Sequence, residues 1–308
     1  MSDKMITVWL PDGSAERVMG GLPGGFRADV WSGAAVPESA GSVEIVIPPF
    51  PVLRPDLSVL GTLPSLRLVQ LLSAGAEKVI PYLPEGVALG VARGAHDDVV
   101  AEWILAVMLS HLRSLPRFTL AQQAGKWDFT LTGTLAGKTV LILGYGSIGA
   151  TLARLLSVFD VTVVPVARHA RPGVSSMDDL PSLLPSADVV VVLVPVTDST
   201  TGMVDAAFLR LMPDKALLVN AARGAVVSNP ALLAELSSGR LFAALDVTAP
   251  EPLPAGHPLW SAPGLIITPH VAGASGKPMA RSLALARAQL ERYAAGEPLR
   301  DLVGNGGY

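Results

Sequence analysis

The 308-residue sequence contains no cysteine, which excludes disulfide bonds, thiolate catalysis and cysteine-ligated zinc. Charged residues make up only 16% of the chain, the net charge is −3 and no basic stripe is present, so nucleic acid is a poor candidate partner. No apolar run approaches the length needed to span a bilayer. No apolar segment follows a basic region near the N-terminus, so we expect no signal peptide and a cytoplasmic protein without membrane contact.

Hydrophobic residues are abundant, at 50% of a chain whose length suggests about two domains. Short apolar runs bounded by Gly, Pro or Asp predict buried strands, and strands and helices alternate along most of the chain. This alternation predicts an α/β fold with a doubly wound parallel sheet. The predicted strands are 5–10, 43–47, 66–72, 87–91, 139–143, 161–166, 188–194, 216–220, 242–247 and 264–268, and the two longest predicted helices are 97–122 and 277–295.

A glycine-rich turn, Gly144-x-Gly146-x-x-Gly149, lies between a predicted strand and a predicted helix. In dinucleotide-binding folds the first glycine allows a tight turn, the second lets the backbone approach a pyrophosphate, and the third lets helix and strand pack closely. Ser147 and Ile148 would then present backbone N–H groups to the phosphates at the start of the helix. A purely structural glycine turn is the alternative, but the strand before it and the helix after it favour dinucleotide binding.

The choice of cofactor should depend on the end of the next strand, where NAD enzymes place an acidic residue for the ribose 2′-hydroxyl. Residues 164–171 contain no acid and carry Arg168 and Arg171, three residues apart in a predicted loop. Two guanidinium groups suit a 2′-phosphate, so we expect NADP as the cofactor, with NAD as the alternative. Two solvated loop arginines would be the simpler interpretation.

Arginine, aspartate, glutamate and histidine side chains follow the later strands, at the sheet edge where ligands bind in α/β folds. They are Arg223, Asp246, Glu251 and His270. A guanidinium can hold a substrate carboxylate, and an imidazolium can give a proton to a carbonyl oxygen as a hydride arrives. A carboxylate can fix the tautomer of that imidazole and keep it charged. This set suits the reduction of a keto acid, although each residue alone is more often structural.

Two further loops follow predicted strands at the same kind of edge. Ser73, Ala74 and Gly75 come after the strand predicted at 66–72, and Pro195 ends the strand predicted at 188–194. We expect the first loop to bind substrate, with an ordinary turn as the alternative, and the second to border the cofactor. The sequence suggests no metal site.

These motifs together resemble the D-isomer-specific 2-hydroxyacid dehydrogenase family over nearly the whole chain. The motifs are the glycine turn, Leu71-Leu-Ser-Ala-Gly75, Val100-Ala-Glu102, Leu218-Val-Asn-Ala-Ala-Arg223-Gly, Ala243-Ala-Leu-Asp246-Val-Thr-Ala-Pro-Glu251-Pro, His257-Pro-Leu-Trp260 and Ile267-Thr-Pro-His270-Val-Ala-Gly273. Three positions depart from the usual pattern: Ala167 replaces the acid after the second nucleotide-domain strand, Ser228-Asn229 replaces a common Asp, and Val91 stands where many members carry Asn.

The resemblance implies a Rossmann nucleotide domain at 98–274 and a flavodoxin-like substrate domain built from both chain ends, 1–97 and 275–308. It also implies that Arg223, Glu251 and His270 are catalytic, with Arg223 and His270 contacting substrate. By the same resemblance Asp246 holds the nicotinamide amide, and the amides of Ala74 and Gly75 hold the substrate carboxylate.

We therefore expect an NADP-preferring reductase of small 2-keto acids, resembling glyoxylate/hydroxypyruvate reductases. The alternatives are an NAD-dependent D-2-hydroxyacid or phosphoglycerate dehydrogenase and, outside catalysis, a dinucleotide-sensing corepressor. The helix predicted at 97–122 is apolar on nearly every side. A helix of this kind has more apolar surface than one domain covers, so we expect a homodimer.

Overall fold

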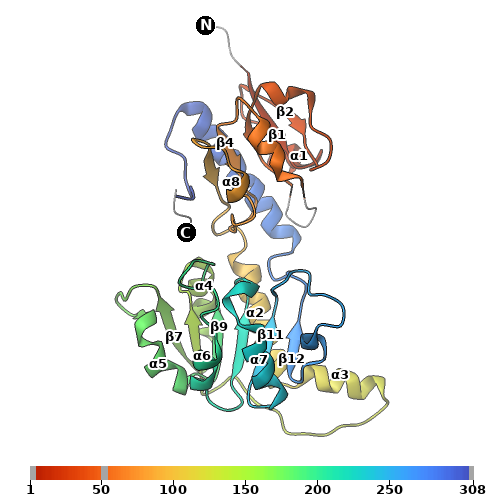
Figure 1. Ribbon diagram of the computed structural model, residues 1–308, viewed down its shortest axis with the longest axis vertical. Coiled ribbons are helices and arrows are strands. Elements are labelled where there is room, and N and C mark those ends of the chain that lie inside the picture. Colours follow the sequence, from red (N-terminus) through yellow and green to blue (C-terminus); the bar gives the residue numbers. More distant parts are fainter. Residues whose placement is uncertain (1–4, 50–54, 305–308) are drawn as a thin grey trace. The chain divides into compact units, whose positions relative to one another are not determined.

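The computed structural model (Figure 1) describes residues 5–49 and 55–304, and the chain divides into two units. The first combines residues 1–96 with 275–308, and the second comprises residues 97–274. Each unit contains one wholly parallel sheet in its described residues, which confirms the predicted α/β class.

The sheet of the first unit has five strands in the order β2-β1-β3-β4-β5. This 2-1-3-4-5 order is that of flavodoxin-like folds, as the family resemblance implied. The strands are β1 (Ile6–Leu10), β2 (Phe26–Val30), β3 (Val43–Val46), β4 (Leu68–Gln70) and β5 (Ala88–Gly90).

Alternate residues of these strands belong to two hydrophobic clusters, one on each face of the sheet. Leu283, Ala286 and Leu290 of helix α8 (Gly276–Ala295) join the cluster that also holds Val8 and Ile45. Helix α1 (Ala15–Val18) contributes to the same cluster, and short 3₁₀ helices, including η3 (Leu57–Thr62) and η4 (Ile80–Tyr82), cover the other face. Helix α8 therefore returns from the end of the chain to complete this core.

The sheet of the second unit has seven strands in the order β12-β11-β10-β9-β6-β7-β8, the strand order of a Rossmann fold. After β6 the chain adds β7 and β8 on one side of that strand, and it then adds β9 and the later strands on the other side. Ligands of α/β sheets bind at this switch point, between β6 and β9. The strands are β6 (Lys138–Leu143), β7 (Val161–Ala167), β8 (Ser175–Ser176), β9 (Val189–Val192), β10 (Leu217–Asn220), β11 (Phe242–Leu245) and β12 (Leu265–Ile267).

Helices cover both faces of this sheet, and neighbouring strand residues point to opposite layers. Leu141 packs with α5 (Leu180–Leu183), α6 (Ala206–Leu211) and α7 (Asn229–Ser237), whereas Ile142 packs with α2 (Asp97–Leu112) and α4 (Ser147–Leu156). These two layers hold the ends of the strands, and hence the loops that follow them, in fixed positions.

The single helix predicted at 97–122 is wrong, because the chain breaks after α2 and continues as α3 (Leu115–Gln123). Ser114 adopts a left-handed conformation at the break, and Pro116 in the first turn of α3 cannot donate a backbone hydrogen bond. No single described helix is long and apolar enough to cross a membrane. The pair α2 and α3 has the length and composition, but it is bent by 64° and α2 is packed on the sheet.

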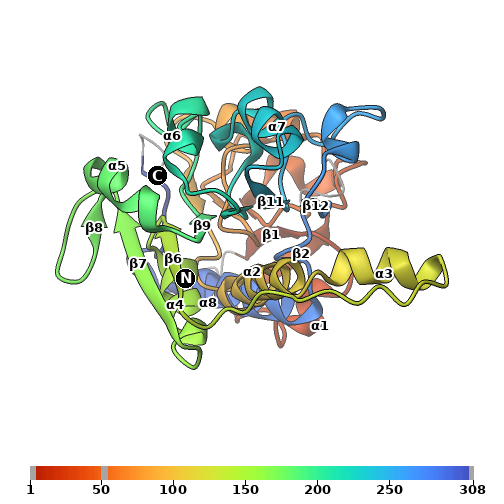
Figure 2. The same cartoon turned by 90° about the horizontal axis from the view of Figure 1, so that it is seen from below.

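Helix α3 and the chain that follows it project away from the seven-stranded sheet (Figure 2). We call residues 113–133 the arm. Its base is closed by a hydrogen bond from Gly133 N–H to the Leu112 carbonyl. Along its length Arg117 binds both carboxylate oxygens of Asp128, at 2.8 and 2.9 Å, and this hydrogen bonding holds the pKa of Asp128 below its usual range.

Candidate active site

The glycine turn follows β6, where the strand order reverses. A Cβ added at Gly144 would lie 2.6 Å from the Leu193 carbonyl carbon, and one at Gly149 would lie 2.9 Å from the Gly144 carbonyl oxygen. Packing therefore demands glycine at both positions. At Gly146 the φ angle is −89° and a Cβ would meet nothing within 4 Å, so neither conformation nor packing requires glycine there.

Helix α4 begins directly after Gly146, and no side chain caps its N-terminus. The first N–H groups of a helix, here beginning with Ser147 and Ile148, have no partner within the helix. Together with the bare surface at Gly146, they form a cradle suited to a phosphate group. The side chain of Ser147 donates a hydrogen bond to Asp97 at 3.2 Å, and Ile148 packs on the core under the sheet.

The two arginines predicted to select the cofactor lie beyond the end of β7, and both are exposed. Arg171 donates a hydrogen bond to the Tyr145 carbonyl at 2.7 Å, which brings it to the glycine turn. The backbone carbonyl of Arg168 accepts a long contact of 3.5 Å from Ser176. The chain thus places one guanidinium against the turn and the other at the end of the strand.

Arg223 lies in the loop after β10, and the buried side chain of Asn220 shapes that loop. Asn220 donates from its amide to the Arg223 carbonyl at 3.0 Å and accepts from the Ala222 N–H at 3.0 Å. The Arg223 guanidinium donates to the Ala222 carbonyl at 2.7 Å. Because Asn220 bonds to both sides of the turn, it determines where the arginine side chain leaves the loop.

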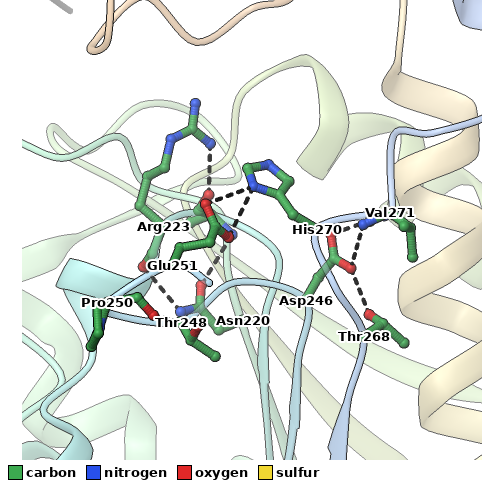
Figure 3. Close-up of polar contacts among 11 residues, drawn as sticks. Asn220, Arg223, Asp246, Thr248, Pro250, Glu251, Thr268, His270 and Val271 are labelled. Atoms are coloured by element: carbon green, nitrogen blue, oxygen red, sulfur yellow. Dashed lines mark hydrogen bonds and ion pairs between the residues drawn. The ribbon is translucent and has the colours of Figure 1, made fainter. Parts of the chain in front are cut away.

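His270 and Glu251 form a close pair between two loops (Figure 3). The Nδ1 atom of His270 lies 3.0 and 3.1 Å from the two carboxylate oxygens of Glu251. The carboxylate accepts, so Nδ1 carries the proton and Nε2 is the nitrogen left to exchange a proton with a ligand. The His270 side chain is 45% exposed, and in Figure 3 it extends to the same side of the loops as Arg223.

The buried carboxylate of Asp246 holds the loop that carries His270. It accepts hydrogen bonds from the Thr268 hydroxyl at 2.5 Å and from the backbone N–H groups of Val271 and Ala272 at 2.9 Å each. The Asp246 carbonyl accepts from the His270 N–H at 2.7 Å. His270 has a φ of 55°, a costly conformation for a residue with a side chain, and these bonds stabilise it.

The loop that carries Glu251 is fixed from two directions. Gly224 packs so closely on it that an added Cβ would lie 2.0 Å from the Thr248 carbonyl carbon. Asn229, at the start of α7, donates from its side-chain amide to the Ala249 carbonyl at 2.6 Å. The roles of Asn220, Gly224 and Asn229 were not expected from the sequence, because each depends on a contact with a backbone segment that sequence patterns do not pair.

The remaining predicted residues lie in ordered loops. In the first unit, Ser73 donates from its hydroxyl to the Gly75 carbonyl at 3.1 Å, and its own carbonyl accepts from the Ala92 N–H at 2.9 Å, so Ala74 sits exposed at the bend. In the second unit, the Pro195 carbonyl after β9 accepts from the Thr200 hydroxyl at 2.6 Å.

The second unit therefore brings Arg223, Glu251 and His270 together at the carboxyl ends of β10, β11 and β12. A fixed guanidinium can bind a carboxylate, and an imidazole paired with a carboxylate can donate or accept a proton at Nε2. Within residues 5–49 and 55–304 no group of three or more His, Asp or Glu side chains could hold a metal ion.

Comparison with known proteins identifies relatives of this chain. Residues 105–272 match the family model "D-isomer specific 2-hydroxyacid dehydrogenase, NAD binding domain". A glyoxylate reductase from Thermofilum pendens is 33% identical over 259 residues, which cover 79% of this chain and 76% of that protein.

Two of the similar solved structures, each of which covers nearly the whole chain, hold a nicotinamide cofactor. One is a D-isomer-specific 2-hydroxyacid dehydrogenase from Xanthobacter autotrophicus Py2 in complex with NADPH and MES, with a TM-score of 0.82, 29% identity and 98% of each chain covered. The other is an NADPH-dependent glyoxylate/hydroxypyruvate reductase from Sinorhizobium meliloti in complex with NADP and sulfate. It has a TM-score of 0.85 and 26% identity, and it covers 98% of this chain and 100% of that chain.

Proposed function

Because the chain belongs to the D-isomer-specific 2-hydroxyacid dehydrogenase family, we propose that it reduces small 2-keto acids to D-2-hydroxy acids with NADPH. Glyoxylate and hydroxypyruvate are the proposed substrates, because relatives carry the names of reductases for these acids. The observation that carries the proposal is the grouping of Arg223 with the His270–Glu251 pair at the ligand-binding edge of a Rossmann sheet. The named relatives are enzymes, which favours turnover over cofactor sensing.

The dinucleotide fits the residues of the glycine turn. Neither the backbone conformation nor the packing at position 146 requires glycine. The lack of a side chain at Gly146 therefore supports close approach of a pyrophosphate there. The first N–H groups of α4, beginning with Ser147 and Ile148, would bind its oxygens. Arg168 and Arg171 would bind the 2′-phosphate, and no acid stands at the end of β7 to favour NAD instead. When bound, the reduced nicotinamide supplies the hydride.

The protein's own residues provide the remaining chemistry. Arg223 binds the carboxylate of the keto acid and so orients its carbonyl group. His270, protonated on both nitrogens, gives the Nε2 proton to the carbonyl oxygen as the hydride reaches the carbon. Glu251 accepts from Nδ1 throughout and stabilises the positive charge of the imidazolium. In the reverse direction, neutral His270 takes the proton from the hydroxy acid.

The first unit is proposed as the substrate domain, and the second as the nucleotide domain. The exposed Ala74 and the bend at Ser73 and Gly75 would offer backbone N–H groups to the substrate carboxylate. Asp246 would accept from the nicotinamide amide in addition to holding the His270 loop. The cytoplasmic location expected from the sequence stays a prediction.

A steady-state screen of keto acids against NADPH and NADH tests this function. We expect turnover with glyoxylate or hydroxypyruvate and a higher kcat/KM for NADPH than for NADH. Equal efficiency with the two cofactors would contradict the assignment of NADP.

We further propose that a second copy of the chain covers the arm. Large apolar side chains on the arm are exposed, and their exposed fractions are 51% for Leu115, 66% for Leu120, 98% for Trp127, 82% for Phe129 and 89% for Leu131. Apolar patches of this kind mark association surfaces. The ion pair of Arg117 with Asp128 orders the arm within one chain, so a partner would meet a preformed surface.

Light scattering at micromolar concentration tests this assembly, and a dimer is expected. Replacing Trp127 and Phe129 by serine should produce a folded monomer. The control is Val158→Ser, which changes an exposed apolar residue outside the arm and should leave the dimer intact. A monomeric unmodified protein would contradict the proposal.

A further inference from the structure

The strongest feature beyond the catalytic group is the way the chain holds Arg171. The backbone of Arg171 is fixed in a tight turn with Pro172 and Gly173 at its centre. Arg171 and Val174 bond to each other, with the Arg171 N–H donating at 3.0 Å and its carbonyl accepting at 2.8 Å. Proline fixes its own φ, and Gly173 adopts a φ of 75° that suits glycine. The turn therefore has little freedom to move Arg171.

Tyr145 then fixes the guanidinium. Its carbonyl accepts from Arg171 Nη2 at 2.7 Å, and the guanidinium carbon lies 5.9 Å from the centre of the tyrosine ring. This distance is within the range of a cation–π contact. Two separate contacts, one to the backbone and one to the ring, thus hold the charged end of Arg171 beside the glycine turn.

Tyr145 is itself a fixed support. Its N–H and that of Gly144 both donate to the Val166 carbonyl, at 3.0 and 2.9 Å, which ties the glycine turn to the end of β7. The half-buried ring packs on the hydrophobic cluster that includes Ile142, and a Cβ at Gly149 would lie 3.3 Å from it. The ring therefore cannot swing away without disturbing the core.

The guanidinium of Arg168, unlike that of Arg171, is not held in place by other described residues. In the part of the chain that the structure describes, its guanidinium makes no hydrogen bond or ion pair, and its side chain is exposed. A free arginine must lose rotamer freedom when it binds an anion, whereas a guanidinium that is already held loses less. The two arginines should therefore contribute unequally to anion binding.

We propose that Tyr145 is a specificity-determining residue that acts through Arg171, holding its guanidinium in place for the 2′-phosphate of NADPH. The inference rests on the proposed function, since it assumes that the two arginines face this phosphate. Tyr145 is a positioning residue: its ring acts on the phosphate only through Arg171. NADH lacks the 2′-phosphate, so its binding should not depend on the ring.

Direct titration of the protein with NADPH and with NADH tests the proposal without requiring turnover. Tyr145→Leu removes the ring and keeps the carbonyl, so the Kd for NADPH should rise about two- to tenfold, as expected when one long side chain must be ordered on binding. The Kd for NADH should change less than about twofold, because only the phosphate contact is affected. Tyr145→Phe keeps the ring and should bind both nucleotides as the unmodified protein does.

A double-mutant cycle separates positioning from a general effect on the glycine turn. After Arg171→Ala, Tyr145→Leu should cause no further loss of NADPH affinity. A matching cycle with Arg168→Ala should show additive losses, because among the described residues the hydrogen bond and the ring contact at Tyr145 come from Arg171 and not from Arg168.

The outcomes distinguish this inference from the proposed function. Equal loss of both nucleotides in Tyr145→Leu, or a full additional loss after Arg171→Ala, would overturn the role of Tyr145 while leaving the NADPH preference in place. Equal affinity of the unmodified protein for NADPH and NADH would instead overturn the proposed cofactor, and the role of Tyr145 with it.

Discussion

Replacing Gly224 by alanine should separate the two loops that carry Arg223 and Glu251. The φ of Gly224 is outside the left-handed region, so alanine can adopt its conformation and only packing matters. The new Cβ would lie 2.0 Å from the Thr248 carbonyl carbon and 2.1 Å from its oxygen. Both are backbone atoms and cannot rotate away. Reaching ordinary contact at 3.4 Å requires a separation of about 1.4 Å at this point.

This displacement gives the expected magnitudes. Overpacking of a filled core typically costs about 1–3 kcal/mol. For a unit spanning residues 97–274, that cost corresponds to a fall of roughly 2–12 °C in Tm. A misplacement of about 1 Å between catalytic groups can reduce the rate on the order of 100-fold. Activity should therefore fall far more than the loss of stability alone would cause.

The assay is keto-acid reduction by Gly224→Ala at a temperature well below its Tm, with Tm measured on the same sample. Gly276→Ala is the matched control, because a Cβ there meets nothing within 4 Å and its φ also lies outside the left-handed region. The control should keep both activity and Tm. If Gly224→Ala retained its kcat/KM, the close packing of the two loops would not position the catalytic groups.

Three further substitutions test individual contacts. Arg223→Lys keeps the charge and loses the planar fork, so KM for the keto acid should rise and kcat should fall while the Kd for NADPH stays the same; unchanged keto-acid kinetics would exclude a carboxylate contact. Glu251→Gln removes the charge beside the imidazole and should lower kcat by about 100-fold or more, and a normal kcat would separate Glu251 from proton transfer. Asn229→Leu removes the bond to Ala249 and should lower kcat by about fivefold, whereas Ser228→Ala, which loses no capping bond, should not; equal effects of the two would refute a specific role for Asn229.

Much of the fold could be predicted from the sequence because buried parallel strands are continuous apolar runs. Residues 189–192 are four consecutive valines, and all of them are buried in β9. The start of α6 is also marked in the sequence, because Asp205 directly precedes the helix and its side chain accepts a hydrogen bond from the Phe208 N–H at 2.8 Å. Such local signals depend only on neighbouring residues.

Two strands and one helix break could not be predicted from apolar patterns. Strand β2 lies at the sheet edge and includes Arg27 and Asp29, so no apolar run marks it. Strand β8 has only two serines, which no pattern identifies. The break in the helix predicted at 97–122 depends on the left-handed conformation of Ser114, which the sequence does not show. Pro116 is a helix-breaking residue and does indicate a break near this point.

In the candidate site, the residues that follow strands could be predicted, whereas the contacts that hold their loops could not. Arg223, Glu251 and His270 were predicted because each follows a strand, and the ends of parallel strands meet at one edge. The contacts of Asn220, Gly224 and Asn229 could not be predicted, since they depend on which backbone segments approach one another in three dimensions. Their roles in catalysis stay predictions.

The proposed activity is tested most directly by measuring NADPH consumption by the unmodified protein and by His270→Ala with glyoxylate and hydroxypyruvate. We expect the unmodified protein to oxidise one NADPH for each keto acid reduced and to form the D-hydroxy acid from hydroxypyruvate. His270→Ala should bind NADPH normally and lose about 100- to 10,000-fold in kcat, the usual contribution of a general acid. Absence of turnover with any small 2-keto acid and either cofactor would contradict the proposed activity, and full activity of His270→Ala would contradict the role of His270 as proton donor.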